Sequence, residues 1–354
     1  KELDKSLANF DDLPQHLAFH TQDMQSYLYG TLELEPWAFT DTGAPSVAEE
    51  VLESVDDPLV KQTLEYKKLY KEKGTYVDNY IKAAEGDGRI HPEIKQTSTS
   101  TSRLSIARPN LQNVFKRDDR VKLRALFCSG EGKKIVRMDY NQLDYRALAA
   151  ITQDPILIAA LSANKKIHQV TADEMKLPYD TAKTVNFGVL FGQEAWALSQ
   201  SLHISIQAAK DFLISYFKRF PNIGKYRDQM KELALAKKPC VIPFTGRTRR
   251  VDAMFADQWR IKQEGIKEFI NMPVQGLEAE IVKIAMIDLH KHNAPAVLQV
   301  HDELLFEIEE QLALEFAHWI KEYVPTISDF GGIRYEVEVG LGNNWYEAMG
   351  NVVA

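Results

Sequence analysis

Two aspartates far apart in the sequence each lie beside an apolar run with the pattern of a strand. Asp139 ends the run 134–139, and Asp302 lies between the runs 296–300 and 304–308. Carboxylate oxygens suit Mg²⁺ and Mn²⁺, and two ions about 3.5–4 Å apart can activate an attacking oxygen and neutralise a leaving one. Two such aspartates are what a two-metal phosphoryl-transfer site requires. A single aspartate at a strand end is more often a cap or turn residue, so this chemistry depends on the fold.

A second candidate group is spaced for one face of a helix. Lys183, Phe187 and Phe191 follow one another at intervals of four residues, so on a helix they form one gently spiralling face. A lysine there can pair with a triphosphate, and the ring of Phe187 can stack against a base or sugar. The alternative is an ordinary amphipathic helix whose lysine extends to solvent.

Much of the chain is expected to be helical. A long amphipathic helix is expected near residues 59–70, with Gly74 breaking or bending its pattern. Hydrophobic periodicity predicts helical segments over most of 1–85, 143–151, 155–235 and 262–292.

Strands are expected around the two aspartates. The runs on either side of Asp302 predict a hairpin with acids at its turn, and the alternation in 335–339 predicts another strand of the same antiparallel sheet. Residues 239–251 are expected to form a hairpin or loop, because they contain a proline and a glycine that favour turns. The hydroxyl-rich segment 96–102 has the composition of a linker, but the residues that follow it argue otherwise.

The composition is that of a folded globule. The chain has 354 residues, of which 45% are hydrophobic, and it has no apolar run long enough for a membrane span and no secretory signal at its start. We therefore expect a cytoplasmic protein, in a nucleoid, a phage-infected host or an organelle matrix, and not a secreted or membrane protein. The two cysteines, Cys128 and Cys240, are distant in sequence, which predicts two buried thiols in a reducing compartment.

The net charge of −7 argues mildly against a nucleic-acid partner. The argument is weak because only basic residues near the phosphates matter for binding. Candidate basic tracks are Arg117-Arg120-Lys122-Arg124 and Arg247-Arg249-Arg250, and the alternative for each is a solvated surface.

The sequences around the candidate residues resemble motifs of the DNA polymerase I family, also called family A. Asp139-Tyr140-Asn141-Gln142-Leu143-Asp144-Tyr145-Arg146 is similar to its first motif, the segment 183–192 to its second and Gln299-Val300-His301-Asp302-Glu303 to its third, in the same order. Further similar stretches are Thr42-Gly43-Ala44-Pro45-Ser46, Arg103-Leu104-Ser105, Pro109-Asn110-Leu111-Gln112-Asn113, Ile167-His168, Asn271-Met272-Pro273-Val274-Gln275-Gly276, Val337-Glu338-Val339-Gly340 and Asn344-Trp345. So many stretches in order make a chance likeness implausible.

The resemblance implies an α+β fold of right-hand architecture, with an antiparallel palm sheet, helical fingers and a helical partial thumb. It implies a template-directed DNA polymerase that adds deoxynucleotides to a primer 3′-end and releases pyrophosphate, in replication or repair. The implied partners are primer-template DNA, dNTPs and a pair of Mg²⁺ ions that Mn²⁺ can replace, with a monomer as the working unit and processivity factors of unknown identity. The domain boundaries would be 1–95 for the partial thumb, 96–155 for the first part of the palm, 156–260 for the fingers and 261–354 for the second part of the palm.

The resemblance also assigns roles to individual residues. Asp139 and Asp302 would hold the metal ions, with Lys183 as a further catalytic residue and Glu303 as a supporting carboxylate. Nucleotide contacts would fall to Gln142, Asp144, His168, Lys183, Phe187 and Phe191. DNA contacts would fall to Arg103, Gln112, Asn113, Arg146, Arg247, Asn271, Gln275 and His301. Arg103 and Gln275 would touch the minor groove, where acceptors occupy nearly the same place in all four base pairs.

Several residues depart from the family pattern. Asp144 stands where the family has Glu, which puts discrimination against ribonucleotides in doubt, and Phe191 replaces a Tyr, which removes a hydroxyl near the template. Ser102 replaces a Gly, so the backbone there should avoid positive φ.

The segment 168–183 is shorter than the family pattern by roughly two to three helical turns. Tyr179 occupies the place of the family's arginine. Either the fingers are truly shortened, or the sequence lacks residues of a mobile loop, and we favour the second interpretation.

Other interpretations remain open. The fold could serve an RNA-templated or ribonucleotide-tolerant polymerase, or an inactive DNA-binding protein. A metal phosphohydrolase built on His301 and Asp302 ranks last, since it needs further histidine ligands at suitable spacings. His301 could also be a simple turn residue and His168 a helix cap. No acidic cluster for proofreading is evident, so this chain is not expected to proofread by itself.

Overall fold

The computed structural model describes residues 2–40, 42–114, 122–190 and 192–353. The chain divides into two compact units, Lys1–Pro92 and Glu93–Ala354. Within the described ranges, no helix is both long enough and apolar enough to cross a membrane.

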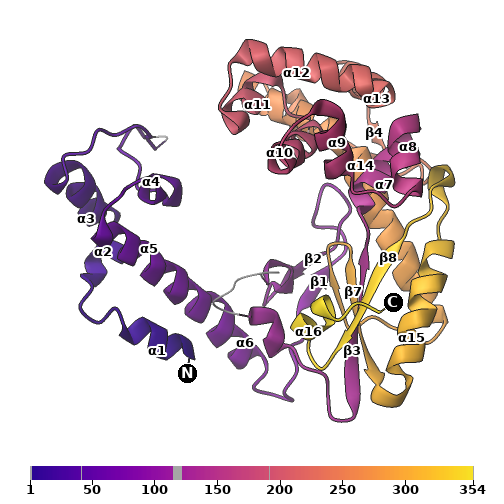
Figure 1. The fold of residues 1–354 in the computed structure, drawn as a ribbon, viewed down its shortest axis with the longest axis horizontal. Coiled ribbons are helices and arrows are strands. Elements are labelled where there is room, and N and C mark those ends of the chain that lie inside the picture. The colour runs from indigo at the N-terminus through magenta and orange to yellow at the C-terminus, as the bar shows by residue number, and fades with distance from the viewer. Residues whose placement is uncertain (1, 41, 115–121, 191, 354) are drawn as a thin grey trace. The chain divides into compact units, whose positions relative to one another are not determined.

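The first unit is built from helices. Its longest helix is capped by Asp57, whose carboxylate accepts a hydrogen bond from Val60 N at 2.9 Å, and Pro58 fits the first turn because its missing N–H is not needed there. Gly74 does not break the pattern, because a wider π-helical turn carries the chain on into the next helix (Figure 1). The elements are α1 (Glu2–Ala8), α2 (Gln15–Phe19), α3 (Thr21–Gln25), the π turn η1 (Ser26–Thr31), α4 (Glu49–Glu53), α5 (Pro58–Lys71), the π turn η2 (Glu72–Val77) and α6 (Asp78–Ala83).

The second unit is organised around an antiparallel sheet of order β6-β7-β3-β8, as the sequence predicts. In β3, Val136 and Met138 are fully buried, and α15 (Glu310–Tyr323) packs against β3 and β8 on one face of the sheet (Figure 1). Two small hairpins, β1–β2 and β4–β5, complete the strands. The strands are β1 (Glu93–Lys95), β2 (Ser105–Ala107), β3 (Lys133–Tyr140), β4 (Cys240–Val241), β5 (Thr248–Arg249), β6 (Leu298–Val300), β7 (Glu303–Glu309) and β8 (Val337–Gly342).

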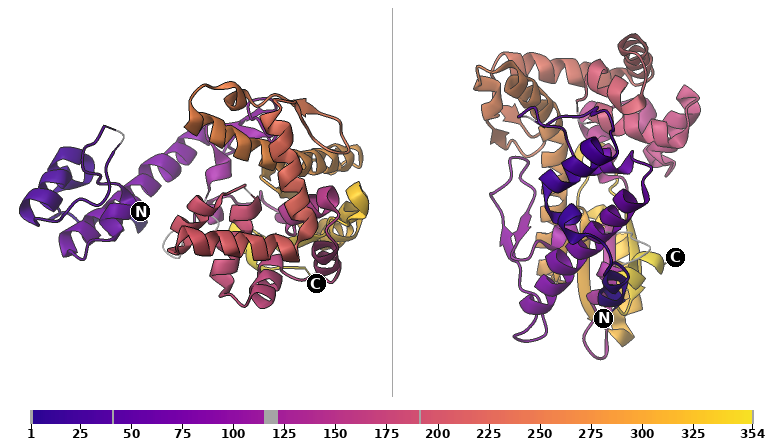
Figure 2. Two further views of the ribbon diagram at one scale, coloured as in Figure 1. Left: turned by 90° about the horizontal axis from the view of Figure 1, so that it is seen from above. Right: turned by 90° about the vertical axis from the view of Figure 1, so that its left-hand side faces the viewer.

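Helices α7 to α13 follow β3 without an intervening strand. Those from α8 to α13 gather beyond the end at which β3 finishes, both in Figure 1 and in the right-hand view of Figure 2. The long helix α14 packs against α7 and β4. The helices are η3 (Leu111–Asn113), η4 (Leu123–Leu126), α7 (Leu143–Thr152), α8 (Pro155–Ser162), α9 (Ile167–Met175), α10 (Tyr179–Leu190), α11 (Ala195–Leu202), α12 (Ile206–Arg219), α13 (Pro221–Leu235), η5 (Asp252–Phe255), α14 (Trp259–Lys291), α15 (Glu310–Tyr323), η6 (Val324–Thr326), η7 (Phe330–Gly332) and α16 (Trp345–Gly350).

Two local predictions are wrong. Ser102 was expected to avoid positive φ, but it has φ +67° and is fully buried. Its hydroxyl accepts a hydrogen bond from Arg249 at 3.4 Å, so tertiary contacts hold a conformation that costs roughly 1–2 kcal/mol for a residue with a Cβ. Cys240 is buried as expected, whereas Cys128 is exposed.

The hydroxyl-rich segment 96–102 is anchored rather than free. Thr99 Oγ1 donates to Arg103 O at 2.6 Å, and the guanidinium of Arg249 donates to Thr99 O at 3.2 Å. The segment therefore belongs to the packed second unit.

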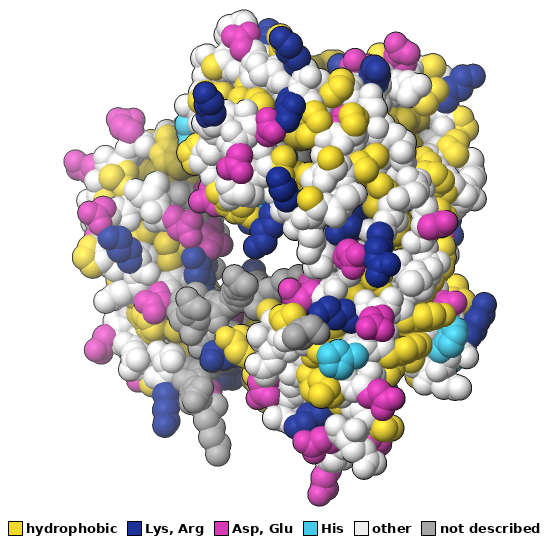
Figure 3. Space-filling model, turned by 45° about the vertical axis from the view of Figure 1, so that its right-hand side comes forward, with side chains coloured by type: hydrophobic (Ala, Val, Ile, Leu, Met, Phe, Trp, Pro, Cys, Tyr) yellow, Lys and Arg dark blue, Asp and Glu magenta, His cyan; other side chains and the backbone are white. Residues whose placement is uncertain are grey.

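Charges of both signs are interspersed on the face drawn in Figure 3. In the first candidate basic track, Arg124 is buried, and Arg117 and Arg120 lie outside the described residues. In the second, Arg247 pairs with Glu280 at 3.0 Å.

The contact between β8 and α16 leaves no room for a side chain at Gly340. A Cβ there would lie 1.9 Å from Ala348 O, and overpacking of this kind typically costs about 1–3 kcal/mol. We expect Gly340→Ala to lower the melting temperature by about 2–5 °C. Gly350→Ala is the matched control, since a Cβ there meets nothing within 4 Å. Equal melting temperatures for the two variants would contradict this packing.

Candidate active site

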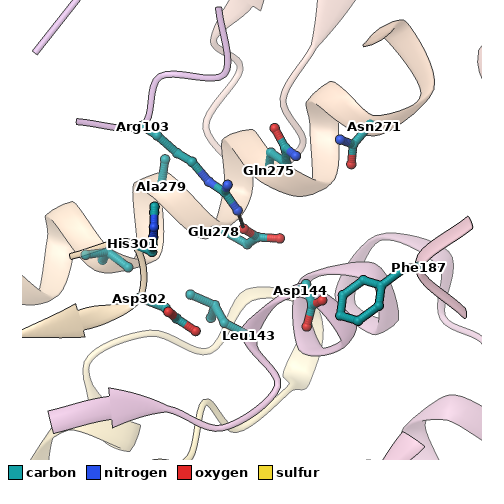
Figure 4. A pocket seen from close by; sticks show the side chains of 11 residues that line it. Arg103, Leu143, Asp144, Phe187, Asn271, Gln275, Glu278, Ala279, His301 and Asp302 are labelled. Atoms are coloured by element: carbon teal, nitrogen blue, oxygen red, sulfur yellow. Dashed lines mark hydrogen bonds and ion pairs between the residues drawn. The ribbon is translucent and has the colours of Figure 1, made fainter. Parts of the chain in front are cut away.

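A cavity of about 290 Å³ gathers many of the residues singled out in the sequence. The two ends of the cavity differ: Asp144 and Phe187 lie at one end and His301 and Asp302 at the other (Figure 4). It is lined by Arg103, Leu143, Asp144, Phe187, Asn271, Gln275, Glu278, Ala279, Val282, His301 and Asp302.

The pairing of β3 with β7 brings the two aspartates together. Asp139 lies opposite Glu303 in the register, and Tyr140 N donates a hydrogen bond to Asp302 O at 3.2 Å. The main chains that carry Asp139 and Asp302 are therefore neighbours. The Asp302 side chain lines the cavity, whereas the Asp139 carboxylate forms an ion pair with Arg137 and is 18% exposed.

His301 forms the turn between β6 and β7. It has φ +56°, and Gln299 Nε2 donates to its carbonyl oxygen, which holds the turn in place. The imidazole is exposed and lines the cavity beside Asp302 (Figure 4).

Glu303 lies in a buried cluster of charges. Its side chain is 1% exposed, and its carboxylate accepts hydrogen bonds from Arg124 at 3.1 Å, from Arg137 at 2.8 Å and from the indole of Trp345. Three donors leave the carboxylate well satisfied where it is. The structure therefore gives Glu303 the role of an anchor for Arg137, which in turn pairs with Asp139.

The aspartates fit a metal site that is completed by a substrate. Among the described residues, no group of three or more His, Cys, Asp or Glu side chains is arranged to hold a metal ion. Asp139, on β3, and Asp302, in the turn before β7, supply two hard carboxylate donors, and Mg²⁺ commonly binds through one or two carboxylates together with substrate phosphates and water.

Helices α9 and α10 bring together the residues predicted to bind a nucleotide. The rings of His168 and Phe187 lie 5.2 Å apart, and Asn186 Nδ2 lies 3.2 Å from His168 Nδ1. Burial, and then the positive charge of Lys183, lower the pKa of His168, so the imidazole is neutral at pH 7. Lys183 is exposed beside it and free to meet an anion in solution.

Helix α14 supplies one wall of the cavity. Asn271, Gln275 and Glu278 recur at helical spacing and share one face. The Asn271 Oδ1 atom is buried and accepts no hydrogen bond from the described residues, so it offers an acceptor to a ligand.

Arg103 reaches the cavity from the segment before β2 and forms an ion pair with Glu278 (Figure 4). Burial raises the pKa of Glu278 to about 7, against the opposing charge of Arg103, and the carboxylates of Asp144 and Asp302 raise it further. Burial likewise raises the pKa of Asp144.

Other predicted residues have structural partners away from the cavity. The Gln142 side chain accepts from Ile167 N at 2.8 Å and thereby caps α9, and Gln112 Nε2 donates to Leu104 O at 3.1 Å. Arg146 is 2% exposed and its Nε donates to Asn141 O at 2.8 Å. The structure does not bring these three side chains, or those of Asn113 and Arg247, into the cavity lining. Phe191 lies outside the described residues.

The sequence interpretation missed Glu278 and Arg137. A signal for Glu278 was present, since it falls on the same helical face as Asn271 and Gln275. Arg137 carries no such signal, because the residues it pairs with come from three different strands.

Comparisons with known proteins agree on one family. The model of DNA polymerase family A matches residues 8–347. The thermostable DNA polymerase I of Thermus thermophilus is 34% identical over 373 residues, which cover 99% of this chain and 44% of the relative. DNA polymerase I of Deinococcus radiodurans is 34% identical over 345 residues, covering 92% of this chain and 36% of the relative. The chain thus spans less than half the length of these curated relatives.

A solved structure is also similar. The POL domain of Pol1 from M. smegmatis, in complex with DNA primer-template and dNTP, has a TM-score of 0.87 and 27% sequence identity. The similarity covers 98% of this chain and 67% of that chain.

The raised pKa of Glu278 predicts a pH-dependent stability. Because the folded pKa of about 7 exceeds the ordinary value of 4.5, the carboxyl contributes most below pH 4.5, and that stability is lost as the pH rises through 7. The full loss is roughly 3 kcal/mol. We expect Glu278→Gln to melt higher than the wild type at pH 8 in EDTA, by a margin that shrinks toward pH 5.

Glu264→Gln is the control for this measurement, since its carboxylate lies on the same helix and is 69% exposed. Its effect on melting should not change over that pH range. A margin for Glu278→Gln that is equally independent of pH would contradict the raised pKa.

Proposed function

The chain belongs to DNA polymerase family A, and we propose that it extends a DNA primer along a template by transferring deoxynucleotides from dNTPs with release of pyrophosphate. The observation that carries the proposal is the hydrogen bond from Tyr140 N to Asp302 O, which holds the main chain of Asp302, a residue that lines the cavity, beside that of Asp139. The complex with DNA primer-template and dNTP described for the M. smegmatis domain supports the choice of substrates. Because the proposed substrate is DNA, the reaction takes place in a compartment that contains DNA, such as a nucleoid, a phage-infected host or an organelle matrix.

The subdomains follow from the same proposal. Residues 1–95 form a partial thumb, an assignment supported by the helical unit that ends at Pro92. Residues 96–155 and 261–354 form the palm, which holds β3, β6, β7 and β8, and residues 156–260 form the fingers with α10.

Asp139 and Asp302 would hold a pair of Mg²⁺ ions, with Mn²⁺ as a substitute. When bound, these ions lower the pKa of the attacking oxygen and neutralise charge on the phosphates. The reaction is an in-line attack of the primer 3′-hydroxyl on the α-phosphate of the dNTP, in which positioning and charge neutralisation supply most of the rate. Arg137 holds the Asp139 carboxylate in position through their ion pair.

The dNTP lies along α10 in this proposal. The exposed Lys183 ammonium binds the triphosphate as a point charge, and the Phe187 ring stacks against the base or sugar. His168 is neutral at pH 7, so it offers a hydrogen bond to the phosphates without repelling Lys183. Gln142 acts indirectly, by capping the helix that carries His168.

The primer end lies along α14. Arg103 and Gln275 contact the minor groove, Asn271 offers a buried acceptor, and His301 lies beside the primer terminus. Asp144 closes the sugar side of the cavity with a carboxylate shorter than glutamate, so discrimination against ribonucleotides is the property in which this chain should differ from relatives with Glu.

Loss of either aspartate tests the proposal directly. We expect Asp139→Ala and Asp302→Ala each to lower primer extension by at least about 10³-fold, because each removes half of the carboxylate set. Primer-template binding should stay within about threefold of the wild type, since the DNA contacts are elsewhere. The measurements are primer extension in Mg²⁺ and fluorescence anisotropy of labelled DNA.

Asp228→Ala, an exposed aspartate on α13, is the matched control and should extend primers normally. Wild-type extension should also stop in EDTA and return with added Mg²⁺ or Mn²⁺. Near-normal turnover in either aspartate variant, or extension without any metal, would refute the assignment.

Lys183 offers a separate test of the nucleotide side. Lys183→Ala should raise KM for dNTPs by about tenfold or more, while the affinity for primer-template changes by less than about twofold. Single-nucleotide incorporation across a range of dNTP concentrations gives the first value and anisotropy the second. Lys210→Ala, at an exposed position on α12, serves as the control. An unchanged KM in Lys183→Ala would show that Lys183 does not bind the triphosphate.

A further inference from the structure

The Arg103 side chain is fixed at both of its ends. At the backbone, Thr99 Oγ1 donates to Arg103 O at 2.6 Å, and Thr99 is itself held by Arg249 through a 3.2 Å hydrogen bond. At the far end, the guanidinium pairs with the Glu278 carboxylate. Two anchors on different elements leave the arginine little freedom to swing within the cavity.

Glu278 is an unusual residue to find at this place. Its side chain is 8% exposed, and the residues that follow it one turn along the helix, Ile281 and Val282, are apolar and buried. A buried ion pair commonly adds little stability compared with apolar packing, because desolvation offsets the attraction. The raised pKa of Glu278 indicates that desolvation outweighs the pairing here. Glu278 therefore contributes by fixing the position of Arg103 rather than by stabilising the fold.

Arg103 and Glu278 pair with each other in the middle of the cavity. Figure 4 shows the Arg103–Glu278 pair between the end that holds Asp144 and Phe187 and the end that holds His301 and Asp302. Gln275 lies on the same face of α14, almost one turn before Glu278. A guanidinium has five N–H donors in a rigid fork, so donors not used by Glu278 remain available to a ligand beside Gln275.

We propose that Glu278 is a positioning residue that fixes the Arg103 guanidinium so that its remaining donors meet the minor-groove acceptors of the primer-terminal base pair. This inference rests on the proposed polymerase function. Minor-groove acceptors occupy the same place in every correct pair, but a mismatch displaces them. A guanidinium held by Glu278 cannot follow the displaced acceptors, so extension from a mismatched end is slow.

Removal of the carboxylate should loosen Arg103 without removing it. We expect Glu278→Ala to lower kcat for incorporation from a matched primer end by about tenfold, with KM for the dNTP changed by less than about twofold. Extension from a mismatched end should fall less, so the ratio of the two rates decreases. Glu278→Gln keeps an acceptor for Arg103 and should remain within about threefold of the wild type.

A double-mutant cycle separates positioning from a general effect on structure. Because Glu278 acts through Arg103, Glu278→Ala should add less than about a further twofold loss when Arg103 is already alanine. Glu264→Ala, an exposed position on the same helix, is the control and should not change any of these rates. Circular dichroism melts verify that each variant is folded before its kinetics are compared.

The outcomes separate this inference from the proposed function. A wild-type chain that does not extend primers would overturn both. An active wild type whose Glu278→Ala variant has normal kcat and normal mismatch discrimination, or whose loss is fully additive with Arg103→Ala, would overturn the positioning role alone.

Discussion

The antiparallel pairing of β3 with β7 is the constraint on which the site depends. Because side chains alternate across a strand, a slip of one residue would turn Asp139 to the other face of the sheet and separate it from Asp302. The register is held by buried apolar side chains such as Val136, Met138 and Phe306, which α15 covers. The core of the second unit thus fixes the geometry of the chemistry at its edge.

Beneath the sheet's end, a buried group of charges makes that register more specific. Glu303 is satisfied only where Arg124, Arg137 and Trp345 can all reach it, and the guanidinium of Arg124 also stacks over the Trp345 ring at 3.9 Å. Removal of one partner would leave an uncompensated buried charge, which is costly. Trp345 is contributed by α16, so a helix near the end of the chain helps to hold Arg137 and, through it, Asp139.

The cavity then combines two kinds of control. In the proposed function the Asp302 end serves phosphate chemistry, whereas Asn271 and Gln275 on α14 present neutral amides, and Arg103, from the segment before β2, is paired with Glu278. The proposed division is compatible with a net charge of −7, because neutral amides that contact base edges in the minor groove need no excess of positive charge. Lys183 provides a separate positive charge on α10.

The sequence by itself determined the family, the helices and strands around the motifs, and the pair of aspartates. Those features depend on residue type and local periodicity, which are readable along the chain. The tertiary structure decided which partner each polar group has. It placed Glu303 in a buried cluster, gave Gln142 a capping role, held Ser102 at positive φ, and joined Arg103 to Glu278 across 175 positions. Such choices depend on which distant segments pack together, and no local pattern encodes that.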